Sequence, residues 1–458
     1  MSAIHSPGYQ RLVTLLLLAA YTFNSMDRTI VSIIAASIQS DLRLTDTEIG
    51  LLGGTAFALL YALGGIPLAR LAERVSRVNI ITVALVIWSG LTALCGTAAT
   101  FPQLLLIRVG VGVAEAGCTP AAHSLISDYY PPAQRASALS VYTSGISLGY
   151  ILAALIGGAI AGRFGWRWAC AAVGLPGIAT ALLIKAVVRE PARGALDALV
   201  RRAAPPAFSI GHELGELRAV AAALLSDPPI RHMLIGITVG AFAAYGFYAF
   251  LPLYLGRAFA LGSAQIGLIA ALTGGAAVGI GILAGGFVAD ALARRGALWY
   301  ALVPALGGLA ALPLFVVAVT ASHWSAAASA LAVAGFFWYT SLGPTFGAVQ
   351  NAVAPHRRAT ASALLYITLA VLGLGLGPLF TGWAIDRWTG ACPGGFAAAG
   401  AGTVAVVACR ATLALATRRG LLMTLAFFAW ATLHYFWAAA ALARSRVPAA
   451  SSVQSDSM

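Results

Sequence analysis

Residues 21–32 read YTFNSMDRTIVS, and this stretch decides what kind of protein the chain forms. It lies inside an apolar run at 12–38 and places Asp27 beside Arg28 in the middle of that run. Of the 458 residues, 60% are hydrophobic and 9% are charged, whereas an ordinary soluble domain has about 25% charged residues. Apolar side chains that face lipid need no polar cover, so this composition predicts an all-α polytopic membrane protein.

Crossing the hydrocarbon core takes a helix of about 20 mainly apolar residues. The chain holds twelve such runs in two sets of six, which predicts two six-helix bundles. The runs lie at 12–38, 49–70, 79–99, 103–126, 137–161, 167–188, 232–255, 264–289, 298–319, 325–352, 360–384 and 420–443.

Two segments allow a different count. The first run could be a signal peptide, because Arg11 precedes its apolar core, but the run continues well past Arg28. The segment 395–417 is apolar enough for a thirteenth span, but it is mostly Ala and Gly. We predict an external loop at 391–417, closed by a disulfide between Cys392 and Cys409 or, alternatively, flanked by two unrelated cysteines.

The domain organisation follows from the two sets of runs. We predict an amino-terminal bundle at 1–188, a cytoplasmic linker at 189–231, a carboxy-terminal bundle at 232–443 and a cytoplasmic tail at 444–458. Apolar residues recur at helical spacing in the linker, which predicts an amphipathic helix on the membrane face. These residues are Ile210, Leu214, Leu217, Val220 and Leu224.

The net charge of +13 is a signal of topology. Most of the 28 Lys and Arg residues fall on one side of the predicted spans, and cytoplasmic loops are rich in these residues. Both termini are therefore predicted to be cytoplasmic, in a multi-pass protein of the inner cell membrane. Nucleic acid is not needed to explain the charge, and the sequence predicts no cofactor, no metal site and a monomer.

The two halves repeat each other. After the second run the chain reads LARLAERVSR, and after the eighth it reads GGFVADALARR. An acid at a helix end can meet the positive amino terminus of a neighbouring helix, so these turns predict cytoplasmic latches; a solvated turn is the alternative. Such a parallel repeat also predicts a central binding site. The predicted latch residues are Glu73, Arg74, Arg77, Arg135, Asp290, Arg294 and Arg358.

These turns resemble those of the major facilitator superfamily, and the resemblance extends over nearly the whole chain. NSMDRT in the first run, LIRVGVGVAEAGCTPAAHSLISDYYPPAQR around the fourth and VVREPARG after the sixth are similar to the Spinster branch. The resemblance implies a transporter whose first, fourth, seventh and tenth spans line a cavity. The chain departs from the pattern at Glu73, at Gly149–Tyr150, and at Ala370 and Leu374, where animal Spinster proteins have His and Asp.

Four charged residues lie inside predicted spans: Asp27, Arg28, Arg108 and Glu115. Each would cost about 2.5–3.5 kcal/mol at the bilayer centre, so together they would consume roughly a whole protein's stability if they faced lipid. They must face a wet cavity or one another. Counting inward from the membrane surfaces places Arg28 and Glu115 at similar depth, which predicts an ion pair between them, whether functional or only structural.

Asp27 then has no equally good partner, because Arg108 is expected further out. A carboxylate held between desolvation and a nearby arginine can bind and release a proton. We predict Asp27 as the principal proton site and Glu115 as its coupled neighbour, with Arg28 and Arg108 completing the charge network. The resemblance to Spinster transporters, in which the matching Asp and Glu respond to protons, agrees with this assignment.

The opposite wall of the cavity is predicted to be aromatic with polar tips, which suits an amphipathic solute. Its residues are Tyr245, Tyr248, Trp338, Tyr339, Thr340 and Gln350.

The expected function is proton-coupled transport of an organic solute, and the Spinster resemblance favours a lysolipid or a sphingolipid-like molecule. A small organic anion is the alternative. A membrane-embedded hydrolase or acyltransferase using His123 and Asp128 lacks a nucleophile motif, so no enzyme is predicted.

Overall fold

The computed structural model describes residues 6–444 apart from 59–60, 62–63, 65–67, 69–70, 72–74, 193–209, 354–356, 391 and 393–402. Every regular element in these residues is a helix. The amino-terminal half contains α1 (Pro7–Ile33), α2 (Ala35–Leu42), α3 (Asp46–Gly50), the π-helical turn η2 (Leu51–Thr55), α5 (Arg77–Cys95), α6 (Phe101–Glu115), α7 (Cys118–Tyr129), α8 (Pro132–Thr143), α9 (Gly145–Leu152), the π-helical turn η3 (Ala153–Gly157), α10 (Gly158–Phe164) and α11 (Trp166–Val187).

The carboxy-terminal half follows α12 (Ile210–Ser226). It contains α13 (Pro228–Phe259), α14 (Ser263–Ala270), the π-helical turn η4 (Ala271–Ala276), α15 (Ala277–Ala293), α16 (Trp299–Thr320), α17 (Trp324–Tyr339), α18 (Leu342–Asn351), α19 (Arg358–Thr368), the π-helical turn η6 (Leu369–Gly375), α20 (Leu376–Asp386) and α21 (Thr403–Arg444).

Prolines mark the start of several helices. Helices α1, α6, α8 and α13 each have proline in the first two positions, where the missing N–H would have no partner in any case. Helix α3 is started by a capping box, in which Thr45 and Glu48 exchange hydrogen bonds.

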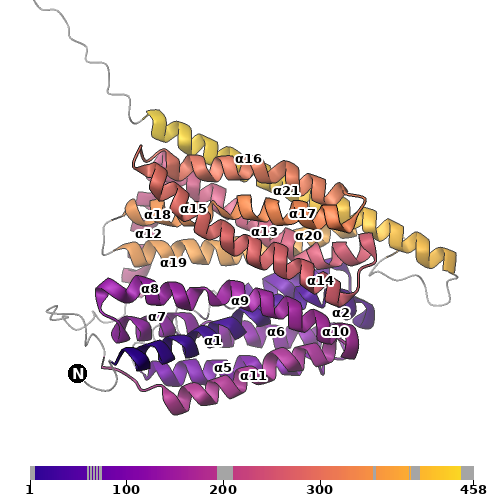
Figure 1. Ribbon diagram of the computed structural model, residues 1–458, viewed down its shortest axis with the longest axis horizontal. Helices are drawn as coiled ribbons and strands as arrows, with labels where there is room; N and C mark the ends of the chain where they lie inside the picture. The colour runs from indigo at the N-terminus through magenta and orange to yellow at the C-terminus, as the bar shows by residue number, and fades with distance from the viewer. Residues whose placement is uncertain are drawn as a thin grey trace, which may run out of the picture.

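The two halves lie side by side with their helices roughly parallel (Figure 1). Ten helical runs in the described residues are long and apolar enough to cross a membrane. Two further crossings complete the twelve-helix fold: α1 with α2, and the run that begins at α3. The prediction of an all-α membrane protein with two six-helix bundles is confirmed.

The last helix corrects one prediction. Helix α21 begins at Thr403, so much of the segment 391–417 is helical where the sequence predicted a loop. The apolar Ala-rich character of this segment extends the twelfth crossing outward, and no separate thirteenth span is needed to accommodate it.

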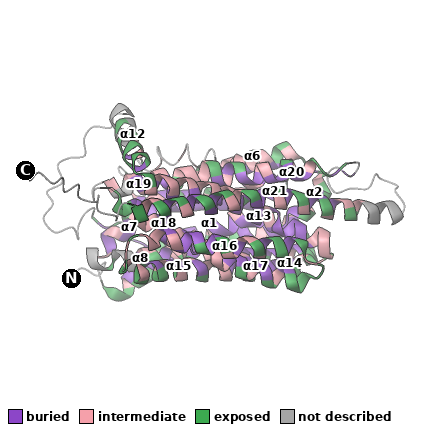
Figure 2. Ribbon diagram, turned by 90° about the horizontal axis from the view of Figure 1, so that it is seen from above, coloured by how far each residue is buried: buried purple, intermediate pink, exposed green. Residues whose placement is uncertain are grey.

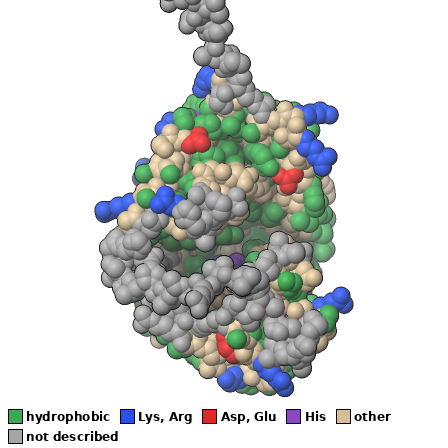
Figure 3. Space-filling model, turned by 90° about the vertical axis from the view of Figure 1, so that its left-hand side faces the viewer, with side chains coloured by type: hydrophobic (Ala, Val, Ile, Leu, Met, Phe, Trp, Pro, Cys, Tyr) green, Lys and Arg blue, Asp and Glu red, His purple; other side chains and the backbone are tan. Residues whose placement is uncertain are grey.

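The ends of the bundle differ in how the halves meet. We call the end with Pro7 and Arg444 the inner end, and the end with Asp46 and Asp386 the outer end. Toward the outer end one hydrophobic cluster joins both halves, including Ile38 and Leu255. Toward the inner end each half has its own cluster. Figure 3 looks onto the inner end and shows a hollow between the halves.

Helix α12 packs on the inner end of the carboxy-terminal half, against α13 and α19 (Figure 2). Val220 and Leu224 on this helix are buried in a cluster with Met233 and Leu365. The helical spacing in the linker sequence therefore corresponds to a helix with one face buried against protein.

Candidate functional site

Two ion pairs lie where α1 meets α6. The Nε atom of Arg28 donates to Oε2 of Glu115 at 2.8 Å, as the depth of these residues predicted. The Nη1 atom of Arg108 donates to Oδ2 of Asp27 at 2.9 Å. Asp27, Arg108 and Glu115 are almost fully buried, whereas the side chain of Arg28 is 27% exposed. The site thus presents one arginine to the space between the halves.

The pairing of Asp27 corrects the sequence argument. Arg108 was expected to lie too far out, but it bonds Asp27 directly, and the Thr92 hydroxyl donates to the other carboxylate oxygen. Asp27 is therefore fully satisfied. Glu115 instead has a buried oxygen, Oε1, with no hydrogen-bond partner in the described part of the chain. Its charged neighbours are Arg28 and Asp27, so the four groups form one coupled network.

Three residues around this network were not identified from the sequence. Phe57 lies between the arginines, with its ring centroid 4.8 Å from the Arg28 guanidinium and 5.9 Å from that of Arg108. Tyr61 stacks on Arg28 at 4.6 Å. Thr92 comes from α5. Aromatic faces attract cations, and an Arg-rich cavity is a signal to search for such residues in adjacent spans.

The predicted aromatic wall divides into two groups. Tyr245 is 44% exposed and lies within electrostatic range of Arg28 across the space between the halves. Tyr366, which the sequence argument missed, is a neighbour of Tyr245 and is 60% exposed. Tyr245 of the carboxy-terminal half therefore lies near Arg28, the exposed member of the charge network.

The other wall residues are mainly used in packing. Trp338 is buried edge-on against Phe428. The Thr340 hydroxyl donates to the Phe337 carbonyl at 2.6 Å. Tyr248 is buried near Tyr339, with ring centroids 6.1 Å apart, although its hydroxyl has no partner in the described structure. Gln350 is exposed and donates to Ser362.

No contact between the halves is seen for the predicted latch residues whose side chains the structure describes, Arg77, Asp290 and Arg294. Arg77 is fully buried within the amino-terminal half, where it contacts Asp128 and donates to Glu190 at 2.6 Å. Asp290 accepts from Tyr300 at 2.8 Å within the carboxy-terminal half, and Arg294 is exposed. Glu73 and Arg74 lie outside the described residues, as do the side chains of Arg135 and Arg358.

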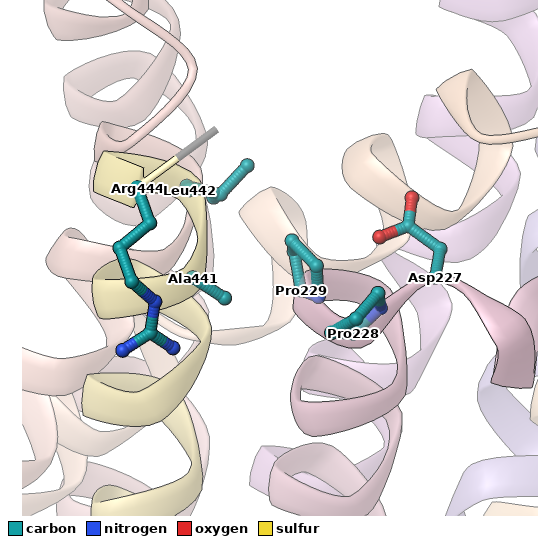
Figure 4. Close-up of a pocket in the computed structure, with 6 residues that line it drawn as sticks. All are labelled: Asp227, Pro228, Pro229, Ala441, Leu442 and Arg444. Atoms are coloured by element: carbon teal, nitrogen blue, oxygen red, sulfur yellow. The ribbon is translucent and has the colours of Figure 1, made fainter. Parts of the chain in front are cut away.

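Two further features lie away from the charge network. Cys392 and Cys409 form a disulfide with their Cα atoms 5.6 Å apart. A cavity of about 410 Å³ lies at the inner end, where Arg444 on α21 stands across from Asp227 at the start of α13 (Figure 4). This cavity does not include any residue of the charge network.

Comparison with known proteins identifies the family. The family model described as Major Facilitator Superfamily matches residues 17–378. The chain belongs to the major facilitator superfamily. It is 32% identical over 368 residues to an MFS-type efflux pump of Mycolicibacterium smegmatis, covering 80% of this chain and 82% of that one. It is 29% identical over 406 residues to a hexuronate transporter of Bacillus subtilis, covering 85% and 90%.

A solved structure places the chain in the Spinster-like branch. This is a bacterial homologue of the human lysosomal transporter Spinster in an inward-facing, unoccupied conformation. It matches with a TM-score of 0.85 and 31% identity, covering 97% of this chain and 100% of that one. The similarity agrees with the hollow at the inner end and the shared core toward the outer end.

Proposed function

We propose that this chain is a secondary active transporter that works by alternating access and couples the movement of an organic solute to protons. The observation that supports this most directly is the buried network of two carboxylates and two arginines beside the hollow. Charges at this depth are expensive unless they pair or face a wet cavity, and inside membrane spans such charges commonly mark substrate or ion pathways. The inner cell membrane is the proposed location, with both termini in the cytoplasm.

Arg28 is the proposed contact for the solute. Its side chain is 27% exposed and its Nε atom is held by Glu115, while its buried Nη2 atom has no hydrogen-bond partner in the described residues. Arginine binds carboxylate and phosphate groups well. The aromatic rings of Tyr61 and Tyr245 beside it suit an apolar portion, so the solute is an amphipath with an acidic group, such as a lysolipid.

A small organic anion is the second candidate. The similarity to a hexuronate transporter favours it, because a hexuronate carries a carboxylate that could bind Arg28 in the same way. The two candidates differ in their apolar portion, so the same site can be tested with both kinds of compound.

A ligand screen followed by transport separates these candidates. Purified protein would be screened for ligands that raise its melting temperature, using lysolipids, sphingoid bases, sugars and organic acids, because a ligand that binds the native state stabilises it. Arg28→Gln should abolish the shift given by an acidic hit, whereas Arg167→Gln, at a half-exposed outer arginine far from the network, should retain it. Counterflow of the unchanged hit in liposomes supports transport; a chemically altered product would contradict it.

A further inference from the structure

One carboxylate ties the two halves together at the outer end. Asp386, the last residue of α20, accepts hydrogen bonds from the first turn of α3 in the other half. Its Oδ1 atom accepts from the Asp46 N–H at 3.1 Å, and its Oδ2 atom accepts from the Thr47 N–H at 2.8 Å and from the Thr47 hydroxyl at 2.5 Å. A carboxylate at a helix amino terminus satisfies free N–H groups and the helix dipole together.

A second contact crosses the same interface. Arg257 on α13 donates to both carboxylate oxygens of Asp46, at 2.8 and 3.0 Å, and also donates to Gln39 at 2.8 Å. Asp46 is 1% exposed, so this bidentate pair is shielded from solvent. The first turn of α3 is thus held by α20 from one direction and by α13 from another.

Backbone contact brings these groups within reach. A Cβ atom added to Gly382 would lie 2.2 Å from the Asp46 carbonyl oxygen, so only glycine permits this approach. Gly382 precedes Asp386 by four residues, which places both on one face of α20. The contact therefore depends on the Gly-x-x-x-Asp spacing at the end of the helix.

The same spacing occurs at the inner end, where it is not engaged. Gly286 precedes Asp290 by four residues on α15, but a Cβ atom on Gly286 would meet nothing within 4 Å. Asp290 is exposed and bonds only within its own half among the described contacts. The outer copy of the motif is closed and the inner copy is open, in agreement with a hollow at the inner end.

We propose that Asp386 is the outer gating residue of the transport cycle. Its bonds to α3 hold the outer end shut and must break before the hollow can open there. The inference rests on the alternating access proposed above, but it concerns only the balance between conformations, so it does not depend on the solute or on protons.

Distances between spin labels test this directly. Labels would be attached at Thr97→Cys and Ser322→Cys, two exposed outer positions on opposite halves, in the full chain without ligand or pH gradient. Asp386→Asn and Gly382→Ala should each raise the ratio of outward-open to inward-open molecules about tenfold. Each variant weakens a contact that exists only when the outer end is closed, so it destabilises the inward-open conformation and not the outward-open one.

Matched controls exist within single halves. Asp41→Asn removes an outer carboxylate that pairs with Arg167 inside the amino-terminal half. Gly308→Ala crowds Thr432 inside the carboxy-terminal half. Both should leave the distance distribution as in the parent. If Asp386→Asn and Gly382→Ala lower the melting temperature but leave the distribution unchanged, Asp386 is only a structural tie and the proposal is wrong. The distance measurement uses no solute, so a protein that transports none of the tested compounds can still show the expected shift. Failure of the proposed function and failure of this proposal are therefore distinguishable.

Discussion

The two buried carboxylates differ in how their oxygen atoms are occupied. Both oxygens of Asp27 accept hydrogen bonds, one from Arg108 and one from Thr92. Glu115 uses Oε2 for Arg28 and leaves Oε1 without a partner in the described structure. A proton can therefore bind Glu115 without breaking an existing hydrogen bond. We therefore propose Glu115 as the preferred proton acceptor and Asp27 as its coupled neighbour, whereas the sequence argument placed Asp27 first.

Neutralising each carboxylate should have a different effect. Glu115→Gln should still bind solute and catalyse counterflow, but it should lose accumulation driven by a pH gradient. Asp27→Asn should be less stable by about 3–5 kcal/mol, because it leaves Arg108 buried without its charge partner. Uptake into liposomes and melting temperatures measure these effects. A Glu115→Gln variant that still accumulates solute on a pH gradient alone would exclude Glu115 as the coupling site.

The sequence identified all four charged residues of the network but predicted only one of their two ion pairs. Counting residues inward found Arg28 and Glu115, because both lie near mid-depth. The same count separated Asp27 from Arg108, since it treats helices as straight and perpendicular to the membrane. Helix tilt and the long arginine side chain remove that separation. Aromatic partners such as Phe57 come from another helix, and their contact depends on helix rotation that a single sequence does not specify.

At the scale of elements, π-helical turns occur where the halves meet. They are η2, η3, η4 and η6, in the second, fifth, eighth and eleventh crossings. The Thr55 hydroxyl in η2 donates to the Gly375 carbonyl in η6 at 2.5 Å, which joins two of these turns. Glycines in the fifth and eleventh crossings, such as Gly158 and Gly377, let neighbouring backbones approach closely. The sequence does not predict the π-helical turns, because these depend on contacts with the opposite half.

The loop after α11 should make stability depend on pH. Partial burial alone would raise the pKa of Glu190, but hydrogen bonds from the Val78 N–H, Arg77 and Ser76 lower it below its usual value. A carboxyl whose pKa is lowered by folding stabilises the protein above its unfolded pKa of about 4.3 and loses this effect as pH falls through the folded pKa. This contribution should therefore be complete at neutral pH and absent in strong acid.

Glu190→Gln tests this dependence. The variant should be less stable by about 1–3 kcal/mol at pH 7, because hydrogen bonds to a charged group are weakened. The difference in melting temperature from the parent should shrink as pH falls below about 4. A constant difference for Glu190→Gln at every pH would contradict the assignment.

The disulfide should stabilise the outer end of the last helix. It links positions 17 residues apart, between the end of α20 and the first turns of α21. Closing a loop of this size stabilises by about 3 kcal/mol in the chain-entropy model. Reduction, or replacement of both Cys392 and Cys409 by serine, should lower the melting temperature. Free thiols at both positions in protein from an oxidising compartment, found by non-reducing mass spectrometry, would show that the bridge does not form.

At the scale of the whole molecule, the two halves share more of their buried core at one end than at the other. They share a hydrophobic cluster toward the outer end and have separate clusters toward the inner end. The repeated motifs in the sequence predicted two equivalent halves and placed latches at the inner end. They could not specify which end is closed, because the alternating access proposed above requires the same sequence to form both contacts in turn. The structure has the outer contact formed, whereas Arg77 and Asp290 at the inner end pair within their own halves.

The orientation of the molecule in the membrane gives the last prediction. Basic residues concentrate at the inner end, which predicts a cytoplasmic inner end, and a disulfide at the outer end suits an oxidising exterior. Cysteines placed at Thr97 or Ser322 should therefore react with an impermeant thiol reagent in cells whose outer membrane is permeable. A cysteine at Gly8 should react only after the inner membrane is opened. The native free cysteines Cys95, Cys118 and Cys170 are buried, so background labelling should be low. Labelling of Gly8→Cys from outside, with protection of the other two cysteines, would show that the orientation is opposite to the predicted one.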